Sequence, residues 1–274
     1  MLILTLGDLL LDVVVRLRER LPPDGEAGAE TRVGAGGQAA NVAAWAAELG
    51  AEARFVGKRA NDGAGLQVAG ELADRGVQLL GPVVDGRTGV VVSIAEPGGL
   101  RSMASDRGIS PALRAEELEM AWFRGADVLH LSGYSLFGTP IDQAGAKAAG
   151  AVRQQGGRIS VDLSSAESIV AFGAERFLER LRQLAPDVIF ATDGELDVLG
   201  GDVDAPLRVR KRGARGIVVH AADGTTELPA VPTDVVDSTG AGDALAAGFL
   251  VGGPELGLAA AARCVAELGA MPRG

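Results

Sequence analysis

The sequence predicts an α/β fold with a central, mostly parallel sheet, helices on both of its faces and a small β-sheet lid. From Pro111 onward, helix-like and strand-like stretches alternate, and repeated βα units build a parallel sheet covered by helices. Residues 88–105 differ, because they read as a β-hairpin with few neighbours to cover both faces. The 274 residues can form one large domain with an appendage or two small domains. We expect a single domain over residues 1–274.

The first half of the chain is expected to supply the first strand and the lid. Leu2–Leu6 is a short apolar run typical of a buried parallel strand. Leu10–Leu17 is a second run, which is broken by prolines and a polar stretch that ends at Thr31. We expect the lid to comprise about residues 10–33 and 86–105, with the hairpin turning at residues 97–99 and pairing with Leu10–Leu17. Between these segments we expect a helix at 42–49, a strand at 53–57 and a helix at 63–75.

The second half of the chain is expected to supply most of the central sheet and its helices. The predicted helices are 115–123, 141–155, 172–184, 242–251 and 256–268. The predicted strands are 128–132, 158–162, 188–191, 216–220 and 225–228, with a strand-like run at 231–236. In such sheets, ligands bind at the carboxyl ends of the strands.

Charge and composition exclude several classes of partner. The net charge of −10 argues against nucleic acid or an acidic membrane surface, which call for a basic face. No stretch of 18 apolar residues is present, and the N-terminus reads as a strand rather than a signal peptide. Cys264 is the only cysteine, so no intramolecular disulfide can form. We therefore expect a cytoplasmic protein without a nucleic-acid or membrane partner.

The segment Asp237-Ser-Thr-Gly-Ala-Gly-Asp243 is the strongest candidate for a chemical site. A helix is predicted to follow it, and its glycines remove side chains where a ligand can reach the backbone. Successive N–H groups at a helix N-terminus bind anions. A carboxylate beside them can take a proton from an attacking hydroxyl while the amides hold a phosphoryl group. The alternative is that Asp243 only benefits from the helix dipole.

This segment and a second one, Gly36-Gly37-Gln-Ala-Ala-Asn41, resemble the two signatures of the ribokinase-like (PfkB-type) carbohydrate kinases. The resemblance extends over nearly the whole chain. It includes Gly7-Asp8 with Asp12, Phe55-Val-Gly57, Asp62-Gly63, Thr88-Gly89, Asp106-Arg-Gly108 and Ser160-Val-Asp162. It implies a three-layer α/β/α sandwich that transfers the γ-phosphoryl group of ATP to a hydroxyl of a sugar or nucleoside, with closure of the lid excluding water.

The resemblance also implies roles for individual residues in phosphoryl transfer. Asp243 matches the general base of the family, and the amides of Gly240, Ala241 and Gly242 match its anion hole.

The second signature matches the family's binding positions for the phosphate acceptor. Asp12, Gly36, Gly37 and Asn41 match positions that hold the hydroxyls of the acceptor. From the residues alone, Asp12 can equally be an edge-strand charge and Asn41 a helix N-cap.

The resemblance further implies sites for ATP, Mg²⁺ and, in some members, a monovalent cation such as K⁺. Thr239, Gly224 and Glu195 match the nucleotide side, and Glu195 matches a position near the metal. Asp237 and the Thr239 carbonyl match the monovalent-cation site, although Asp237 can equally brace the turn.

The sequence departs from the family pattern on the nucleotide side. Thr192 stands where an Asn-x-x-Glu stretch begins in the family, so Glu195 is kept and the asparagine is not. We place the expected Thr-x-Gly-x-x-Gly stretch at residues 219–224, where the hydroxyl and the first glycine are missing. His220, within that stretch, can contact either a nucleotide or solvent. These departures motivate a rival hypothesis, a degenerate kinase fold that binds a sugar or nucleoside without phosphorylating it.

Other nucleotide-binding and metal-binding signatures do not fit. Residues 34–39 match a Gly-x-Gly-x-x-Ala pattern, but about 27 residues separate it from the first strand, which excludes a Rossmann fingerprint. No Walker A motif is present, and two histidines and one cysteine far apart do not form a zinc site. We expect a sugar rather than a nucleoside as acceptor, because the lid segments lack aromatic residues that would stack on a base. The apolar lid face needs cover, and the resemblance implies that a second copy of the lid provides it in a homodimer.

Overall fold

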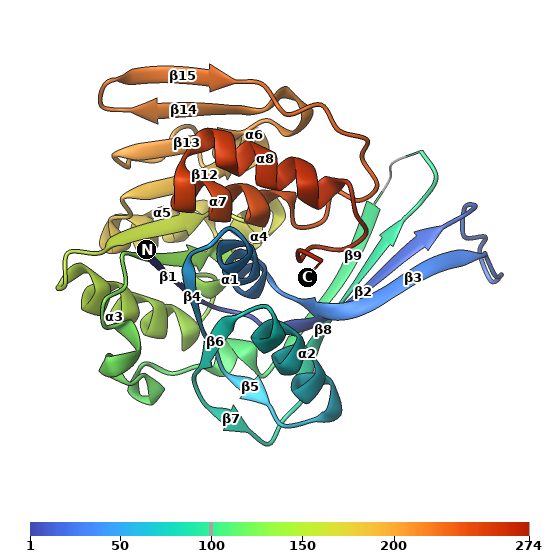
Figure 1. Cartoon of the computed structure of the whole chain (residues 1–274), viewed down its shortest axis with the longest axis horizontal. Helices are drawn as coiled ribbons and strands as arrows, with labels where there is room; N and C mark the ends of the chain where they lie inside the picture. Colours follow the sequence, from blue (N-terminus) through green and yellow to red (C-terminus); the bar gives the residue numbers. More distant parts are fainter. Residues whose placement is uncertain (99–100, 274) are drawn as a thin grey trace.

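The computed structural model describes residues 1–98 and 101–273, which form one large sheet covered by helices and a smaller sheet beside it (Figure 1). In spatial order, the strands of the large sheet are β15 (Gly224–Leu228), β14 (Ile217–Ala221), β13 (Leu207–Lys211), β12 (Val188–Thr192), β11 (Arg158–Asp162), β10 (Val128–Ser132), β1 (Leu2–Leu6), β4 (Glu52–Val56) and β6 (Val77–Leu80). All neighbours from β13 to β6 are parallel, and β14 and β15 form an antiparallel edge. The predicted α/β fold with a mostly parallel sheet is thus confirmed.

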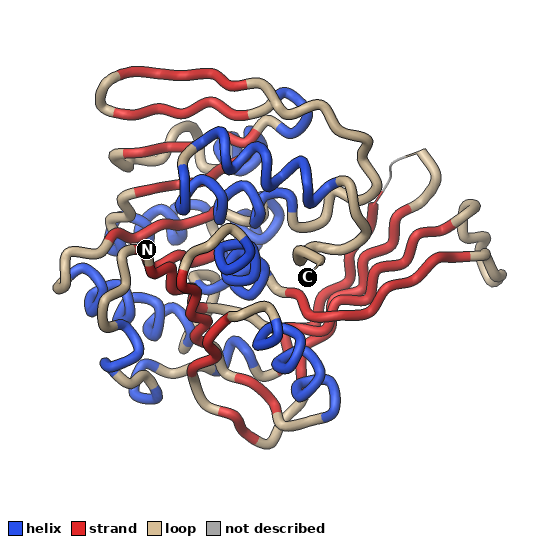
Figure 2. The backbone as a smooth tube through the Cα atoms, in the orientation of Figure 1, coloured by secondary structure: helices blue, strands red, loops and turns tan. Residues whose placement is uncertain are grey.

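Helices lie on both faces of the large sheet (Figure 2). The α-helices are α1 (Gln38–Glu48), α2 (Gly63–Asp74), α3 (Ile141–Arg153), α4 (Ala166–Phe172), α5 (Ala174–Leu184), α6 (Asp193–Val198), α7 (Ala241–Gly252) and α8 (Pro254–Val265). Buried side chains of α1, α7 and α8 form one core against the sheet, and those of α3, α4 and α5 form a second core on its other face. No helix among the described residues is long and apolar enough to cross a membrane.

The smaller sheet contains β3 (Ala29–Gly36), β2 (Leu10–Leu17), β8 (Thr88–Ala95) and β9 (Arg101–Gly108), in that order. The predicted pairing is confirmed, because β2 runs parallel to β8 from Leu11 beside Val90 to Arg16 beside Ala95. The hairpin turn predicted at residues 97–99 lies partly outside the described residues. A third pairing joins β5 (Arg59–Ala60) to β7 (Val83–Val84).

Several predicted elements were wrong or missing, each for a local reason. Strand β3 was missed because glycines and charges replace apolar residues on it, and its pairing with β2 holds it in place. Strand β13 was missed because charges flank its one fully buried side chain, Val209. The run at 231–236 is a loop rather than a strand, and Val236 contributes a single backbone bond to Val265.

The predicted helix at 115–123 is wrong. Two 3₁₀ turns occupy this segment, with extended backbone at Leu118 and Glu119 between them. This break buries both Leu118 and Phe123 in the core, which one continuous helix would not do at a spacing of five residues. The 3₁₀ turns of the chain are η1 (Ser110–Ala112), η2 (Ala115–Glu117), η3 (Met120–Phe123), η4 (Gly133–Ser135) and η5 (Gly213–Arg215).

Candidate active site

The turn that precedes α7 has a backbone conformation that only glycine adopts easily. Gly240 has a φ of 77°, and a β-carbon at this position would lie 2.6 Å from the Cα of Ala270. Asp237 braces the turn, because its Oδ1 accepts hydrogen bonds from the Thr239 amide (2.9 Å) and hydroxyl (2.7 Å). Its Oδ2 accepts from the Gly269 amide at 2.9 Å. Both oxygens of Asp237 are therefore already engaged by the protein.

The first turn of α7 presents free backbone donors. Among the described residues, the amides of Gly242 and Asp243 have no backbone acceptor, whereas the Ala241 amide lies 3.4 Å from the Ser238 carbonyl. A helix N-terminus with unpaired N–H groups carries a partial positive charge. The segment therefore has the free donors that the predicted anion site would need, and it is called the anion-binding turn below.

Asp243 lies in the same turn with its side chain buried. Its Oδ2 accepts a hydrogen bond of 2.7 Å from Nδ2 of Asn41, on α1. The pKa of Asp243 is raised to about 7, chiefly by burial and also by the charges of Asp162 and Asp12, against the opposing effects of Asn41 and Lys211. A carboxylate with this pKa is half ionised at neutral pH, which suits a general base.

Asn41 joins the two sequence signatures and is not the N-cap of its helix. Gly37 occupies the N-cap position, with a φ of 96°, and a β-carbon there would lie 2.5 Å from the Asp8 carbonyl oxygen. Asn41 lies one turn further and is 4% exposed. Its Oδ1 is buried and has no partner among the described residues. An orphaned acceptor is costly unless a ligand pairs with it, so this atom is available to a hydroxyl of a bound molecule.

Asp12 projects from β2, which lies between β3 and β8, so the edge-strand interpretation of this residue is wrong. A β-carbon on Gly36 would lie 2.0 Å from Cγ of Asp12, and only glycine therefore leaves room for this carboxyl. Burial and the charge of Asp237 raise the pKa of Asp12 to about 7. The two sequence signatures thus bring Asp12, Asn41 and Asp243 into one site.

A buried charge cluster lies beside the anion-binding turn and was missed by the sequence analysis. Lys211 Nζ is 2.6 and 2.7 Å from the two carboxylate oxygens of Asp162. The position of Gly242 lies against this lysine, since a β-carbon there would be 3.7 Å from Nζ. Although burial opposes its charge, Asp162 and Glu195 raise the pKa of Lys211, which keeps it cationic.

Glu195 is buried in α6, and Thr192 forms a capping box with it. The Thr192 amide donates to Glu195 Oε2 (2.7 Å), and the Thr192 hydroxyl accepts from the Glu195 amide (3.3 Å). Burial raises the pKa of Glu195, with Lys211 opposing that shift. Thr192 thus replaces the expected asparagine and still orients Glu195. In the described part of the chain, Glu195 Oε1 has no hydrogen-bond partner.

An apolar cavity of 460 Å³ opens next to the anion-binding turn. Its walls come from η5 and the residues around it, from the 230–235 loop and from α7 and α8. They include Gly213, Gly216, Ile217, Val231, Pro232, Val235, Ala241, Gly242, Leu245, Leu258, Ala261, Ala262 and Val265, with Lys211 at one side. A volume and lining of this kind suit a small organic ligand such as a nucleobase with its ribose.

Gly224 does not reach this cavity. Ile217 pairs with Leu228 at one end of the β14–β15 hairpin, and Ala221 pairs with Gly224 at the other, about 13 Å away along the strand. His220 bonds Thr225 (2.9 Å) in the same hairpin. A Gly-x-x-Gly spacing is nevertheless present at the cavity, in Lys211-Arg-Gly213-Ala-Arg-Gly216 directly after β13. The sequence contains this spacing. It was not recognised because β13, the strand that precedes it, was not predicted.

The comparisons with known proteins identify the family of the chain. The sequence profile of the "pfkB family carbohydrate kinase" matches residues 2–272. The chain belongs to this family. Among pfkB-family relatives, it is 33% identical over 260 residues to the ATP-dependent ribose-1-phosphate kinase of Halopiger xanaduensis, which covers 90% of this chain and 83% of that protein. It is 28% identical over 273 residues to a fructokinase of Escherichia coli, over 92% of this chain and 84% of that protein.

The architecture of the pfkB family member is that of solved ribokinase-like kinases. The adenosine kinase of Sinorhizobium meliloti superposes with a TM-score of 0.87, at 26% identity, over 99% of this chain and 96% of that one. An E. coli structure described as "a putative Ribokinase II" gives a TM-score of 0.87 at 22% identity, over 98% of this chain and 94% of that one. The protein is a phosphotransferase with a hydroxyl acceptor, and the family uses ATP together with a divalent metal ion.

The residues around the apolar cavity of this pfkB-family chain fit a nucleoside triphosphate. The free amides of α7 and the cationic Lys211 lie beside the apolar cavity, which is the arrangement that a nucleoside triphosphate requires. No cluster of three or more metal-ligating side chains occurs within residues 1–98 and 101–273. A metal ion in this site would accordingly rely on the oxygens of the nucleotide as well as on Glu195.

Proposed function

We propose that this enzyme transfers the γ-phosphoryl group of ATP to a hydroxyl of a small sugar and that Asp243 accepts the proton of that hydroxyl. One observation carries the proposal: the buried Asp243 carboxylate lies in the same helical turn as free amides and is bonded to Asn41 of the N-terminal signature. A base, an anion hole and a hydroxyl-binding amide therefore meet at one point.

The acceptor would lie between the smaller sheet and α7. Asn41 Oδ1 and the Asp12 carboxyl are available to its hydroxyls, and Gly36 and Gly37 leave the space that these groups need. The amides of Gly240 and Gly242, together with that of Ala241, whose bond to the Ser238 carbonyl is long at 3.4 Å, would stabilise charge on the transferred group while Asp243 holds the proton.

The nucleotide would occupy the apolar cavity, with its phosphates towards α7. Lys211 supplies positive charge at that point, and Thr239 lies in the turn beside it. We propose that Glu195 Oε1 would bind water that Mg²⁺ coordinates. The metal ion would neutralise charge on the phosphates.

At the position that the resemblance suggests for K⁺, Asp237 already uses both oxygens, and the Thr239 carbonyl accepts from Cys264 Sγ at 3.3 Å. We therefore propose that Asp237 braces the turn and that K⁺ is not required.

A sugar is the better acceptor than a nucleoside. Residues 10–33 and 86–105 contain no aromatic side chain that would stack on a base. Two relatives named above are kinases of a ribose phosphate and of fructose, and one structural neighbour is a kinase of adenosine.

The wild-type protein should turn over at least one pentose or hexose with Mg-ATP in a coupled ADP-release assay. Thermal stabilisation by a sugar or nucleoside, with no ADP release for any acceptor, would instead support a binding protein without kinase activity.

The pH profile should report the carboxyl at the centre of the site. Because the pKa of Asp243 is about 7 and the base must be ionised, kcat/KM should rise roughly tenfold per pH unit below pH 7 and level off above it. Asn41 lowers the pKa of Asp243 through its hydrogen bond, so Asn41→Leu should move the midpoint to higher pH. Steady-state kinetics from pH 5.5 to 9 measure both.

Asp12 provides the control for this profile, because its pKa is also about 7 and the two carboxyls interact. Asp12→Asn removes this charge, so the midpoint of the pH profile should shift to lower pH. Below that midpoint, kcat/KM of the variant should still rise with pH. If kcat/KM of Asp12→Asn no longer changed with pH, the titration would belong to Asp12, which would contradict the role of Asp243.

We also propose that the protein is a cytoplasmic homodimer in which the outer faces of two smaller sheets pack together. Val33 is 50% exposed on that face, and it pairs with Val13, which pairs with Val92. β-Branched residues that are half exposed at Val33 and partly buried at Val13 and Val92 favour burial against a second copy. Sedimentation velocity should show a dimer for the wild type and a monomer for Val33→Glu. A wild-type protein that is still monomeric at a concentration of about 50 µM would contradict the proposal.

A further inference from the structure

The residues that follow α8, 266–273, connect the anion-binding turn to other parts of the proposed site. Trp45 of α1 donates through Nε1 to the Ala270 carbonyl at 2.9 Å. A β-carbon on Gly240 would lie 2.6 Å from the Cα of Ala270. Figure 1 shows this end of the chain next to the smaller sheet. The 266–273 segment therefore contacts both the helix that carries Asn41 and the anion-binding turn.

One peptide group of this segment connects the smaller sheet to Asp237. Arg32 of β3 donates to the Leu268 carbonyl. The N–H of the same peptide group belongs to Gly269 and donates to Asp237 Oδ2 at 2.9 Å. Hydrogen bonds that follow one another in this way polarise each other. The positive charge of Arg32 therefore acts on the Asp237 carboxylate through a single peptide group.

Gly269 permits the close approach of Arg32. Its φ is 97°, and a β-carbon at this position would lie 3.2 Å from Nη1 of Arg32. A larger residue would strain the backbone and press on the guanidinium. Glycine at this position thus serves the contact with Arg32 as well as the turn of the chain.

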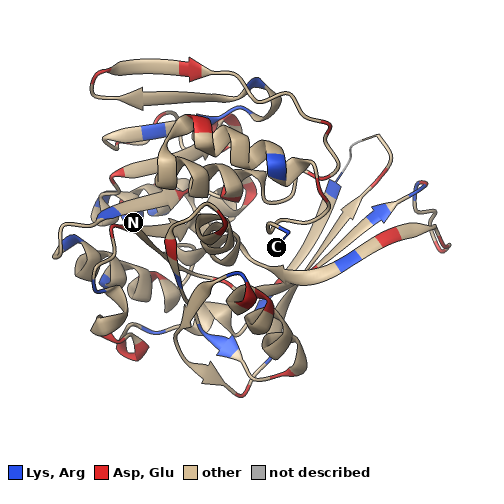
Figure 3. Ribbon diagram, viewed as in Figure 1, with Lys and Arg blue, Asp and Glu red and all other residues tan. Residues whose placement is uncertain are grey.

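The other oxygen of Asp237 also leads to the smaller sheet. Oδ1 accepts from the Thr239 hydroxyl at 2.7 Å, and that hydroxyl accepts from Arg101 of β9 at 2.7 Å. Figure 3 shows basic positions on β3 and β9, the two edge strands of this sheet. Within residues 1–98 and 101–273, no lysine or arginine bonds directly to Asp237. Its charge is therefore balanced from the smaller sheet, through one intervening group on each side.

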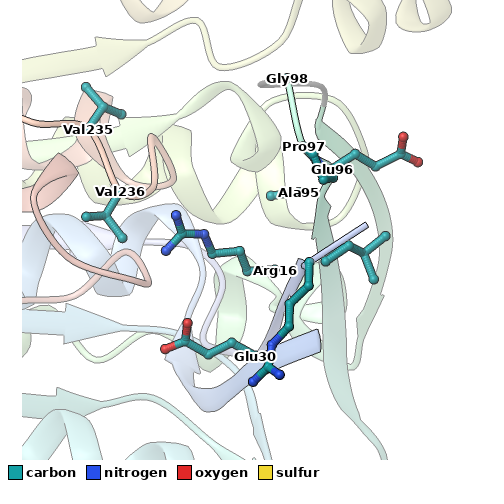
Figure 4. A pocket seen from close by; sticks show the side chains of 10 residues that line it. Arg16, Glu30, Ala95, Glu96, Pro97, Gly98, Val235 and Val236 are labelled. Carbon is teal, nitrogen blue, oxygen red and sulfur yellow. The ribbon is translucent and has the colours of Figure 1, made fainter. Parts of the chain in front are cut away.

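The outer end of the smaller sheet does not pack tightly against the protein. A cavity of 560 Å³ separates it from the 235–236 loop. Figure 4 shows the Arg16 side chain extending from the sheet towards Val236 at this cavity. The position of the sheet over the anion-binding turn consequently depends on contacts nearer the acceptor site, among them the bond of Arg32.

Arg32 lies beside the residue of the smaller sheet that would bind the acceptor. Asp12 pairs with Gly34, and Val14 pairs with Arg32, so Asp12 and Arg32 project from the same face. Strands β2 and β3 stay paired from Leu10 to Leu17, which makes them one structural unit. An acceptor held by Asp12 would thus also fix the position of Arg32.

The negative charge of Asp237 works against the anion-binding turn. Its carboxylate is 7% exposed and braces the turn whose amides would hold the transferred phosphoryl group. Repulsion between this carboxylate and a bound phosphate weakens phosphate binding unless a cation offsets it. Arg32 supplies that cation while the smaller sheet lies against the 266–273 segment.

We propose that Arg32 is a positioning residue through which a bound acceptor tightens the hold of the anion-binding turn on the phosphates. With the acceptor in place, Arg32 keeps its bond to the Leu268 carbonyl, which offsets the charge of Asp237 and fixes the turn. The inference rests on the proposed kinase function. Its consequence is reciprocal, because acceptor and nucleotide must then each increase the affinity for the other.

Isothermal titration calorimetry measures this coupling without turnover. The Kd of Mg-bound adenylyl imidodiphosphate, a non-hydrolysable ATP analogue, is measured alone and with saturating D-ribose, D-fructose or adenosine. In the wild type, at least one of these acceptors should lower that Kd about 5–100-fold. In Arg32→Gln the same acceptor should lower it less than about twofold, with the Kd of the analogue alone little changed. Arg32→Lys should recover most of the coupling, because lysine keeps the charge and can still donate to the Leu268 carbonyl.

Arg75→Gln is the matched control. Arg75 of α2 donates to the Pro272 carbonyl at 3.2 Å, so it holds the same segment from outside the smaller sheet. This variant should lose as much stability in urea as Arg32→Gln does and should keep the wild-type coupling. Equal loss of coupling in the two variants would show that Arg32 only anchors the segment, and would overturn the inference.

The outcomes also separate this inference from the function on which it rests. Turnover together with a coupling that Arg32→Gln leaves intact overturns the inference and leaves the kinase function standing. A coupling that depends on Arg32, without ADP release for any acceptor, supports the inference and shows a binding protein rather than a kinase. If none of the three acceptors changes the Kd of the analogue in the wild type, the inference is overturned whatever the turnover.

Discussion

Asp243→Asn should abolish turnover, with kcat falling by about 10²–10⁴-fold while the fold is retained. The asparagine keeps the shape and can still bond Asn41, but it cannot take the proton of the acceptor hydroxyl. ADP release measured with the best acceptor tests this directly. Retention of more than roughly a tenth of the wild-type rate would contradict the assignment of Asp243 as the base.

The same variant should be more stable than the wild type at alkaline pH. The folded-state pKa of about 7 lies above the ordinary value of 3.8, so the native protein binds a proton that the unfolded chain releases between these values. The stabilisation from this carboxyl is therefore complete below pH 3.8 and is lost as pH rises through 7. Asp243→Asn should raise the Tm at pH 8, and the difference should shrink towards pH 4.

Lys211→Met should destabilise the protein by about 3–5 kcal/mol, the largest stability effect that we predict for a single side chain. Asp162 is 3% exposed and Glu195 is 4% exposed, and both depend on the charge of Lys211. Without the lysine, a buried carboxylate is left without its partner. Turnover should also fall, because positive charge near the transferred phosphoryl group is lost. Urea denaturation at pH 7, followed by circular dichroism, measures the change.

Two variants control this prediction. Arg210→Met removes a neighbouring cation on the same strand whose partner Asp193 is more than a third exposed, so it should cost about 0–1 kcal/mol. The double variant Lys211→Met with Asp162→Asn should recover part of the lost stability, because it removes the unpaired charge as well. A Lys211→Met protein as stable as the Arg210→Met protein would show that the buried pair is not structurally important.

Sequence reasoning named Asn41 and Asp243, which the structure brings together, but missed Lys211 beside the apolar cavity. Asp243 and Asn41 fall in compact glycine-rich segments whose local pattern already indicates their geometry, although 202 positions separate them. Lys211 and Asp162 meet only because β11 and β13 lie on either side of β12 in the sheet. Strand order is a property of tertiary packing, and no local pattern carries it.

Two of the strands that sequence reasoning missed share a physical cause. Strands β3 and β13 are held by backbone pairing rather than by apolar side chains, so their hydrophobic pattern is weak. Because β13 was not recognised, the glycine pattern at Gly213 and Gly216 had no strand before it and was sought at Gly224 instead. Fully buried strands such as Leu2–Leu6 were predicted at their observed bounds, since continuous burial leaves a continuous apolar run.

Cys264 makes this chain well suited to fluorescence labelling. It is the only cysteine, and burial raises the pKa of its thiol to about 12, so alkylating dyes will leave it unmodified in the folded protein. A cysteine placed at the exposed Ser102, next to Arg101 on β9, would then be the single reactive thiol. A dye at that point would report, in real time, whether the smaller sheet moves when nucleotide and sugar bind.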